Sequence, residues 1–139
     1  MKVPFTGGCA CGAVRYKCSV APVLMLKCHC RDCQRFSGGP YTPVVVPFAA
    51  FKITQGEIQR YGTPSLAVGH NVRGFCPQCR SRVTGAESVG KGIIGQTASS
   101  LDDPGWSEAK LDLYVSDAQP WEQMDPDLPK FPHYMPRGS

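Results

Sequence analysis

The chain has 139 residues, which is enough for one hydrophobic core and hardly for two, so a single domain over residues 1–139 is expected. Its 15 Gly and 13 Pro interrupt every stretch that could form a long helix, and this excludes a helical bundle. The formal net charge of +4 comes from Lys and Arg spread singly along the chain, so no nucleic-acid partner is expected.

Short stretches of alternating apolar and polar residues predict an all-β protein. Strands are predicted over residues 13–17, 23–28, 41–46, 51–54, 58–61, 71–75, 92–97 and 111–115. Gly, Pro, Asn and Asp predict the turns between them at residues 7–8, 38–40, 55–56, 62–64, 90 and 102–105. Helical turns are predicted only over residues 31–36 and 99–102.

A Pro-rich segment over residues 120–136 follows the last predicted strand and can form neither a helix nor a central strand. Trp121, Leu128 and Phe131 favour an extended arm that lies against the body of the protein over a loose tail. Residues 137–139 are left out of the argument because they can be a remnant of an expression vector.

The longest apolar stretch, over residues 43–51, is broken by Pro47 and is far shorter than the ~20 residues that a membrane-spanning helix needs. Residues 1–12 lack the apolar run of ~7–15 residues that marks a secretory signal. We therefore expect no membrane partner and a cytoplasmic location. In a reducing cytosol, clustered cysteines are more often metal ligands or catalytic thiols than disulfides.

Seven of the eight cysteines fall into three tight groups. The Cys76-Pro77-Gln78-Cys79 spacing is typical of a zinc knuckle, which supplies half of a tetrahedral site. Cys9 and Cys11 are the available second pair, so these four cysteines predict a closed, structural zinc site. The alternatives are buried free thiols or two disulfides.

Cys28, Cys30 and Cys33 form the third group and supply three sulfurs with no obvious fourth ligand. Three protein ligands and an open position are typical of a catalytic zinc. One alternative is that Cys18 or His29 completes a second structural site, although His29 should point away from a metal that both of its neighbours face. The other alternative is a metal-free thiol group used in redox exchange.

A zinc ion held by three thiolates carries a net charge of about −1 and is a weak Lewis acid, so it favours a soft ligand such as a thiol. Lys27, Arg31 and Arg35 surround this group and can offset its charge or hold an anionic substrate. The expected substrate is therefore a thiol or thioester-like compound with carboxylates. His70 and His133 lie near no recognisable motif, and both are expected at the surface.

The ordered set of motifs resembles the glutathione-dependent formaldehyde-activating enzyme family, which includes centromere protein V. The likeness covers about residues 5–131, and Arg80 stands where family members often have Gly. The matching pieces are Gly8-Cys9-Ala10-Cys11-Gly12-Ala13-Val14-Arg15-Tyr16, Cys28-His29-Cys30-Arg31-Asp32-Cys33-Gln34-Arg35 with Ser37-Gly38, Gly56-Glu57 with Tyr61, Arg73-Gly74-Phe75-Cys76-Pro77-Gln78-Cys79, and the closing Leu113-Tyr114-Val115-Ser116, Pro120-Trp121 and Leu128-Pro129-Lys130-Phe131.

The resemblance implies a folded-over β-tent of small antiparallel sheets with two zinc ions. It assigns Cys9, Cys11, Cys76 and Cys79 to a structural zinc, and Cys28, Cys30 and Cys33 to a catalytic zinc. The implied activity is that of a carbon–sulfur lyase, which joins glutathione to formaldehyde as S-hydroxymethylglutathione. The alternative is a non-catalytic interaction module with two closed zinc sites, and the role of Cys18 separates the two. The sequence carries no sign of the oligomeric state or of the residues that recognise glutathione.

Overall fold

A computed structural model describes residues 2–65, 69–88 and 92–135. Within these ranges the all-β prediction is confirmed, since small antiparallel sheets dominate and α1 (Arg31–Ser37) is the one α-helix described. The chain divides into two compact units. Unit 1 comprises Met1–Leu24 and Pro43–Ser107, and unit 2 comprises Met25–Thr42 and Glu108–Ser139. A single domain over 1–139 stays a prediction.

The smaller sheet of unit 1 has the strand order β1-β2-β6, formed by β1 (Phe5–Gly8), β2 (Arg15–Cys18) and β6 (Phe51–Gln55), all antiparallel. Tyr16 and Cys18 of β2 are buried while Lys17 between them is exposed, which is the alternation that predicts a strand here. The turn predicted at residues 7–8 is wrong, because both glycines belong to β1. Gly7 pairs with Tyr16, and a Cβ at Gly7 would overlap the hydroxyl group of that tyrosine.

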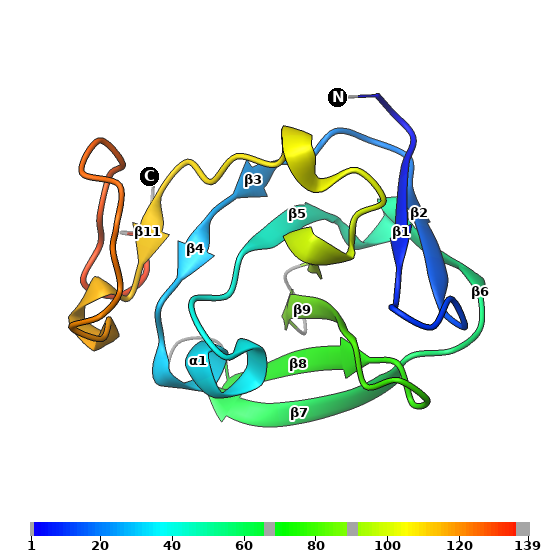
Figure 1. Cartoon of the computed structure of the whole chain (residues 1–139), viewed down its shortest axis with the longest axis horizontal. Helices are drawn as coiled ribbons and strands as arrows, with labels where there is room; N and C mark the ends of the chain where they lie inside the picture. The colour runs from blue at the N-terminus through cyan, green and yellow to red at the C-terminus, as the bar shows by residue number, and fades with distance from the viewer. Residues whose placement is uncertain (1, 66–68, 89–91, 136–139) are drawn as a thin grey trace. The chain divides into compact units, whose positions relative to one another are not determined.

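The larger sheet has the order β3-β5-β10-β9-β8-β7, and β3 (Leu24–Met25) lies where the chain leaves unit 1. β5 supplies the buried Val44, Val45 and Val46, a continuous apolar run suited to a strand covered on both faces. Figure 1 shows β7, β8 and β9 beside one another as successive antiparallel strands. The bounds are β5 (Pro43–Pro47), β7 (Gln59–Ser65), β8 (Gly69–Phe75), β9 (Arg82–Ser88) and β10 (Ile93–Thr97).

The turn predicted at residues 62–64 is also wrong, because these residues continue β7 and pair with β8. β7 is the edge strand of its sheet. An edge strand accepts a proline such as Pro64, because the N–H that proline lacks is not needed there to hold two interior strands together. β9 is not predicted, since Gly85 and polar residues interrupt its apolar pattern and the consecutive Val83 and Thr84 are both buried. The turn predicted at Gly90 lies outside the described residues.

Short 3-10 helices follow strands in both units. The helical turn predicted over 99–102 is confirmed as η2 (Ala98–Ser100), shifted toward the N-terminus. The turn predicted over 102–105 contains the start of η3 (Pro104–Trp106), where Asp103 Oδ1 accepts a hydrogen bond from the Gly105 N–H at 3.2 Å. The remaining 3-10 helices are η1 (Phe48–Ala50) and η4 (Val115–Asp117).

Unit 2 is built around a two-stranded parallel pair of β4 (Lys27–Cys28) and β11 (Asp112–Leu113). The strand predicted over 23–28 is thus split into β3 and β4, and the strand predicted over 111–115 ends early because Tyr114 adopts the left-handed conformation, with φ of 55°. The predicted helical turn at 31–36 is confirmed as α1, which ends at Gly38 with φ of 84°.

The Pro-rich arm lies along β11 of unit 2. The Asp112 N–H donates to the carbonyl oxygen of Pro129 at 2.9 Å, and the Phe131 N–H donates to that of Asp112 at 3.0 Å. The predicted arm against the body of the protein is therefore confirmed within this unit, but Trp121 does not anchor it, since 78% of that residue is exposed. None of the helices described is both long and apolar enough to cross a membrane.

Candidate metal centres

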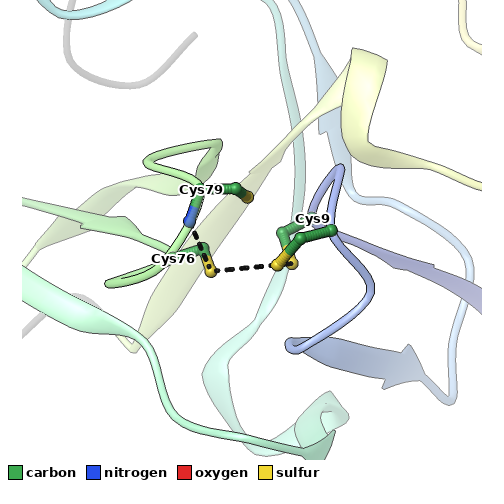
Figure 2. Close-up of side chains that lie close together, drawn as sticks. Cys9, Cys76 and Cys79 are labelled. Carbon is green, nitrogen blue, oxygen red and sulfur yellow. Dashed lines mark hydrogen bonds between the residues drawn. The ribbon is translucent and has the colours of Figure 1, made fainter.

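The first cysteine cluster lies in unit 1, where two loops face each other. The loop between β1 and β2 carries Cys9 and Cys11, and the turn between β8 and β9 carries Cys76 and Cys79. Figure 2 shows the Cys76 and Cys79 side chains on one side and Cys9 facing them from the other loop. The four Sγ atoms all lie within 4.8 Å of one another, although 64 residues separate Cys11 from Cys76.

Backbone hydrogen bonds shape each half of this four-cysteine cluster. The N–H groups of Gln78 and Cys79 point at Cys76 Sγ, at 3.4 and 3.5 Å, as the second of these does in Figure 2. On the other loop the Val14 N–H points at Cys9 Sγ at 3.2 Å. These donors stabilise thiolates, so the loops are arranged for ionised sulfur.

The spacing of the sulfurs fits a tetrahedral ion. The Sγ atoms of Cys9 and Cys11 are 3.6 Å apart, and those of Cys11 and Cys76 are 3.8 Å apart. An ion with Zn–S bonds of ~2.3 Å at the centre of a regular tetrahedron places its sulfurs about 3.8 Å apart. All eight cysteines are free, so the alternative of two disulfides is not what the structure shows.

The thiols of this cluster differ in pKa. Hydrogen bonds from the Ser81 side chain and backbone lower the pKa of Cys79 to about 5. Although the backbone N–H of Ala13 favours the Cys11 thiolate, the neighbouring sulfur of Cys9 and other nearby sulfurs raise the pKa of Cys11 to about 11. Like charges at this distance resist joint ionisation, so the cluster requires a cation to hold four thiolates together.

The second cluster lies in unit 2 and contains the sulfurs of Cys28, Cys30 and Cys33, again within 4.8 Å of one another. Cys28 ends β4, Cys30 is the N-cap of α1, and Cys33 is buried in the first turn of that helix. The Cys33 N–H points at Cys30 Sγ at 3.2 Å. Among the described residues, no His, Cys, Asp or Glu joins this group as a fourth ligand.

Two strands and a helix hold this three-cysteine cluster in place. Cys28 exchanges two backbone hydrogen bonds with Tyr41, at 2.8 and 2.9 Å, and pairs with Leu113 of β11. The two neighbouring sulfurs, and burial after them, raise the pKa of the Cys28 thiol well above its usual range. A cation must therefore offset the mutual repulsion before all three sulfurs can ionise.

The other predicted participants lie elsewhere. His29 turns away from the sulfurs, as expected, and its Nε2 donates to Asp112 Oδ1 at 2.8 Å. Cys18 belongs to neither cluster, and its thiol donates to Gln96 Oε1 at 3.4 Å inside unit 1. His133 is exposed, as predicted, and the side chain of His70 lies outside the described part of the chain. Arg31 and Arg35 are exposed on α1, where the Arg31 guanidinium donates to Gln34.

Tyr114 and Tyr134 form an aromatic pair in unit 2 that the sequence does not single out. Their rings pack edge to face with centroids 5.1 Å apart, and Tyr114 contacts His133 in the same way at 5.5 Å. Burial, followed by the charge of the three cysteines, raises the pKa of both phenols. Both phenols are therefore protonated at neutral pH.

The architecture and the clusters define a class: an all-β protein with one four-cysteine and one three-cysteine group, each with the geometry of a metal ligand set. The sequence model of the family described as glutathione-dependent formaldehyde-activating enzyme matches residues 4–117. The chain belongs to this family, which confirms the resemblance noted from its motifs. The family associates it with glutathione and with the activation of formaldehyde.

The crystal structure of a Rhodobacter sphaeroides protein, a structural genomics target, is similar to this one with a TM-score of 0.57. The two share 17% sequence identity over 70% of this chain and 87% of the other. At this identity the likeness shows the fold alone. No curated protein matches the sequence significantly.

Proposed function

We propose that the protein is a zinc-dependent enzyme of the carbon–sulfur lyase type that acts on a thiol adduct. The expected reaction joins glutathione and formaldehyde as S-hydroxymethylglutathione. The observation that carries the proposal is the three-cysteine cluster, because three sulfurs converge there and no described residue adds a fourth ligand. Membership of the family supports the choice of thiol and aldehyde.

In this proposal the two clusters have different roles. Cys9, Cys11, Cys76 and Cys79 hold a structural zinc, which the near-tetrahedral spacing of the sulfurs supports. Cys28, Cys30 and Cys33 hold a second zinc whose remaining position is open to a small-molecule thiol. A reducing compartment such as the cytoplasm keeps all of these ligands as thiols.

Zinc at the three-cysteine cluster would supply a ligand position at which the pKa of a substrate thiol is lowered. In the reaction the thiol loses its proton, its sulfur forms a bond to the aldehyde carbon, the carbonyl π electrons move to oxygen, and that oxygen takes up a proton in place of the one that the thiol lost. The phenols of Tyr114 and Tyr134 are protonated and can donate a hydrogen bond to this oxygen. Arg31 and Arg35 are exposed on α1 and can bind the carboxylates of glutathione.

The proposal is tested with cobalt in place of zinc, since cobalt reports its ligands in the visible spectrum. Glutathione should shift the spectrum of the wild type and of Cys18→Ala, but not that of Cys28→Ser. Exchange spectroscopy with isotopically labelled formaldehyde should show faster formation of S-hydroxymethylglutathione with the wild type than with Cys28→Ser. Zinc analysis should give two ions per chain in the wild type and in Cys18→Ala, and one in Cys28→Ser.

A spectrum that glutathione leaves unchanged would instead favour the second candidate, an interaction module with two closed zinc sites. The exposed ring of Trp121, a residue type enriched at protein interfaces, is the observation that supports this candidate. Loss of the second zinc in Cys18→Ala would point the same way, because Cys18 would then be a metal ligand.

A further inference from the structure

Unit 2 contains a chain of three charged or ionisable residues that the proposed reaction does not use. His29 Nε2 donates to Asp112 Oδ1 at 2.8 Å, with only 2% and 1% of the two side chains exposed. Lys130 Nζ lies 3.8 Å from the other carboxylate oxygen, Asp112 Oδ2. Burying a carboxylate this completely costs free energy unless it is paired, so the Asp112 carboxylate depends on its two partners.

His29 lies between two ligands of the three-cysteine cluster and is held from two sides. Its N–H donates to the carbonyl oxygen of Leu113 at 2.9 Å, so β11 binds it through the main chain and, one residue earlier, through the Asp112 carboxylate. Its own carbonyl oxygen accepts a hydrogen bond from Gln34 Nε2 at 2.6 Å. The segment between the two cysteine ligands is thus fixed at its N–H, its carbonyl and its side chain.

The orientation of His29 decides the orientation of its neighbours. In an extended segment, successive side chains point to opposite sides. When the imidazole turns toward Asp112, the sulfurs of Cys28 and Cys30 turn the other way, toward Cys33. A rotation of the backbone at His29 that took the imidazole away from Asp112 would also turn the neighbouring sulfurs away from Cys33.

We propose that His29, Asp112 and Lys130 are positioning residues for the metal ion of the three-cysteine cluster. The hydrogen bond between His29 and Asp112 aims two of the three sulfurs. The ammonium group of Lys130 offsets the carboxylate, so that the buried negative charge does not oppose the three thiolates. The inference rests on the proposed function in one respect, namely that a metal ion binds this cluster.

The same contacts give the Pro-rich arm a role at the proposed metal centre. Lys130 pairs with Asp112 in a parallel bridge, and its Nζ also donates to the carbonyl oxygens of Asp125 and, at 3.0 Å, Leu128. The turn of the arm therefore holds the ammonium group in one place instead of leaving it free in solvent. In this proposal the arm completes the charge balance of the metal centre.

The decisive comparison is His29→Gln with His29→Asn. The amide nitrogen of glutamine stands about as far from the backbone as the Nε2 of histidine, so it can still donate to Asp112. The amide nitrogen of asparagine is one carbon shorter and cannot reach. Asp112→Leu keeps the branched shape of the side chain without an acceptor, and Lys130→Met removes the charge together with the hydrogen bonds to Asp125 and Leu128. Lys110→Met is the matched control, because Lys110 pairs with Glu108 at the surface, with 55% and 74% of the side chains exposed.

Zinc affinity is measured by competition with a chromogenic chelator, and the four-cysteine cluster of the same molecule serves as the internal reference. His29→Asn and Asp112→Leu should weaken zinc binding at the three-cysteine cluster about 10- to 100-fold, the usual effect of losing a group that orients metal ligands. Lys130→Met should show a smaller loss, and His29→Gln and Lys110→Met should stay within about 3-fold of the wild type. The cobalt spectra of His29→Asn and Asp112→Leu should shift, and those of His29→Gln and Lys110→Met should not.

Equal losses in His29→Gln and His29→Asn would overturn the inference, because bulk and not the hydrogen bond would then matter. If His29→Asn also loses zinc from the four-cysteine cluster and so fails to fold, Asp112→Leu and Lys130→Met decide, and wild-type affinity in both overturns it. A wild type without metal at the three-cysteine cluster would overturn the proposed function as well. Unchanged variants of a metal-binding wild type would overturn this inference alone.

Discussion

Arg80 holds its backbone in the left-handed region at the end of the turn that carries Cys76 and Cys79. Its φ is 65°, and its N–H donates to the carbonyl oxygen of Cys76 at 2.9 Å, which closes the turn around the ligands. A side chain with a Cβ is strained in this conformation, whereas Gly adopts it freely. The strain is local, since the Arg80 side chain itself is exposed.

Arg80→Gly should therefore stabilise the zinc-bound protein. Relief of the left-handed strain contributes about 1 kcal/mol, and the greater freedom of Gly in the unfolded chain offsets part of this, which leaves roughly 0.5 kcal/mol. Gln78→Gly is the matched control: it is exposed in the same turn without a positive φ, so it should lower stability by about 0.5 to 1 kcal/mol. Chemical denaturation measures both, and a destabilised Arg80→Gly would contradict the argument.

Gly56 follows β6 with φ of 75° and lies directly against the chain that leads into β2. A Cβ there would overlap the carbonyl oxygen of Ala13, a backbone atom that cannot move without disturbing the pairing of β2 with β6. Gly12 has a similar φ of 82° but open space around it. Replacing either glycine with alanine therefore strains the backbone, and only at Gly56 does the new Cβ also overlap another atom.

Gly56→Ala should accordingly destabilise unit 1 more than Gly12→Ala does. The left-handed conformation alone costs about 1 to 2 kcal/mol in either variant, and the overlap adds about 1 to 3 kcal/mol in Gly56→Ala. Thermal unfolding of the two zinc-bound variants gives the difference directly. Equal unfolding midpoints would contradict this prediction, because they would mean that the turn after β6 can move to accommodate the Cβ without loss of stability.

Local patterns in the sequence account for part of these elements. The strand over 51–54 and the helical turn at 31–36 were predicted because alternation and turn residues act over a few positions. β1 and β7 were misjudged because Gly7 and Gly62 resemble turn residues in the sequence, while Gly7 in fact makes room for Tyr16 across the sheet. Such a reason is visible only once the partner strand is known.

Part of the candidate site can likewise be predicted from the sequence, and part cannot. Ligand spacing is local, so the sequence indicated both cysteine clusters, and the structure brings their sulfurs together. The partner of His29 is 83 positions away in Asp112, and no spacing rule connects the two. The pairing of Tyr114 with Tyr134 is likewise not predicted, because the contact between their rings depends on how β11 and the arm fold back in unit 2.

At the scale of the whole molecule, each compact unit contains one cysteine cluster. Unit 1 has the four-cysteine cluster, which ties the loop after β1 to the turn after β8. The described part of unit 2 has little regular structure beyond α1, η4 and the short β4 and β11 pair, so we expect its stability to depend more on the metal. This division bears on whether residues 1–139 unfold as a single domain.

Removal of zinc with a chelator should therefore proceed in two steps. The ion with three protein ligands should leave first, because a site with fewer ligands releases its metal more readily. Hydrogen exchange should then increase over residues 25–42 and 108–135 while β1, β2 and β8 stay protected, and these strands should lose protection only with the second ion. Cys28→Ser should reproduce the first state without chelator, which assigns the steps. Loss of protection in both units with the first ion would show instead that the chain unfolds as one domain.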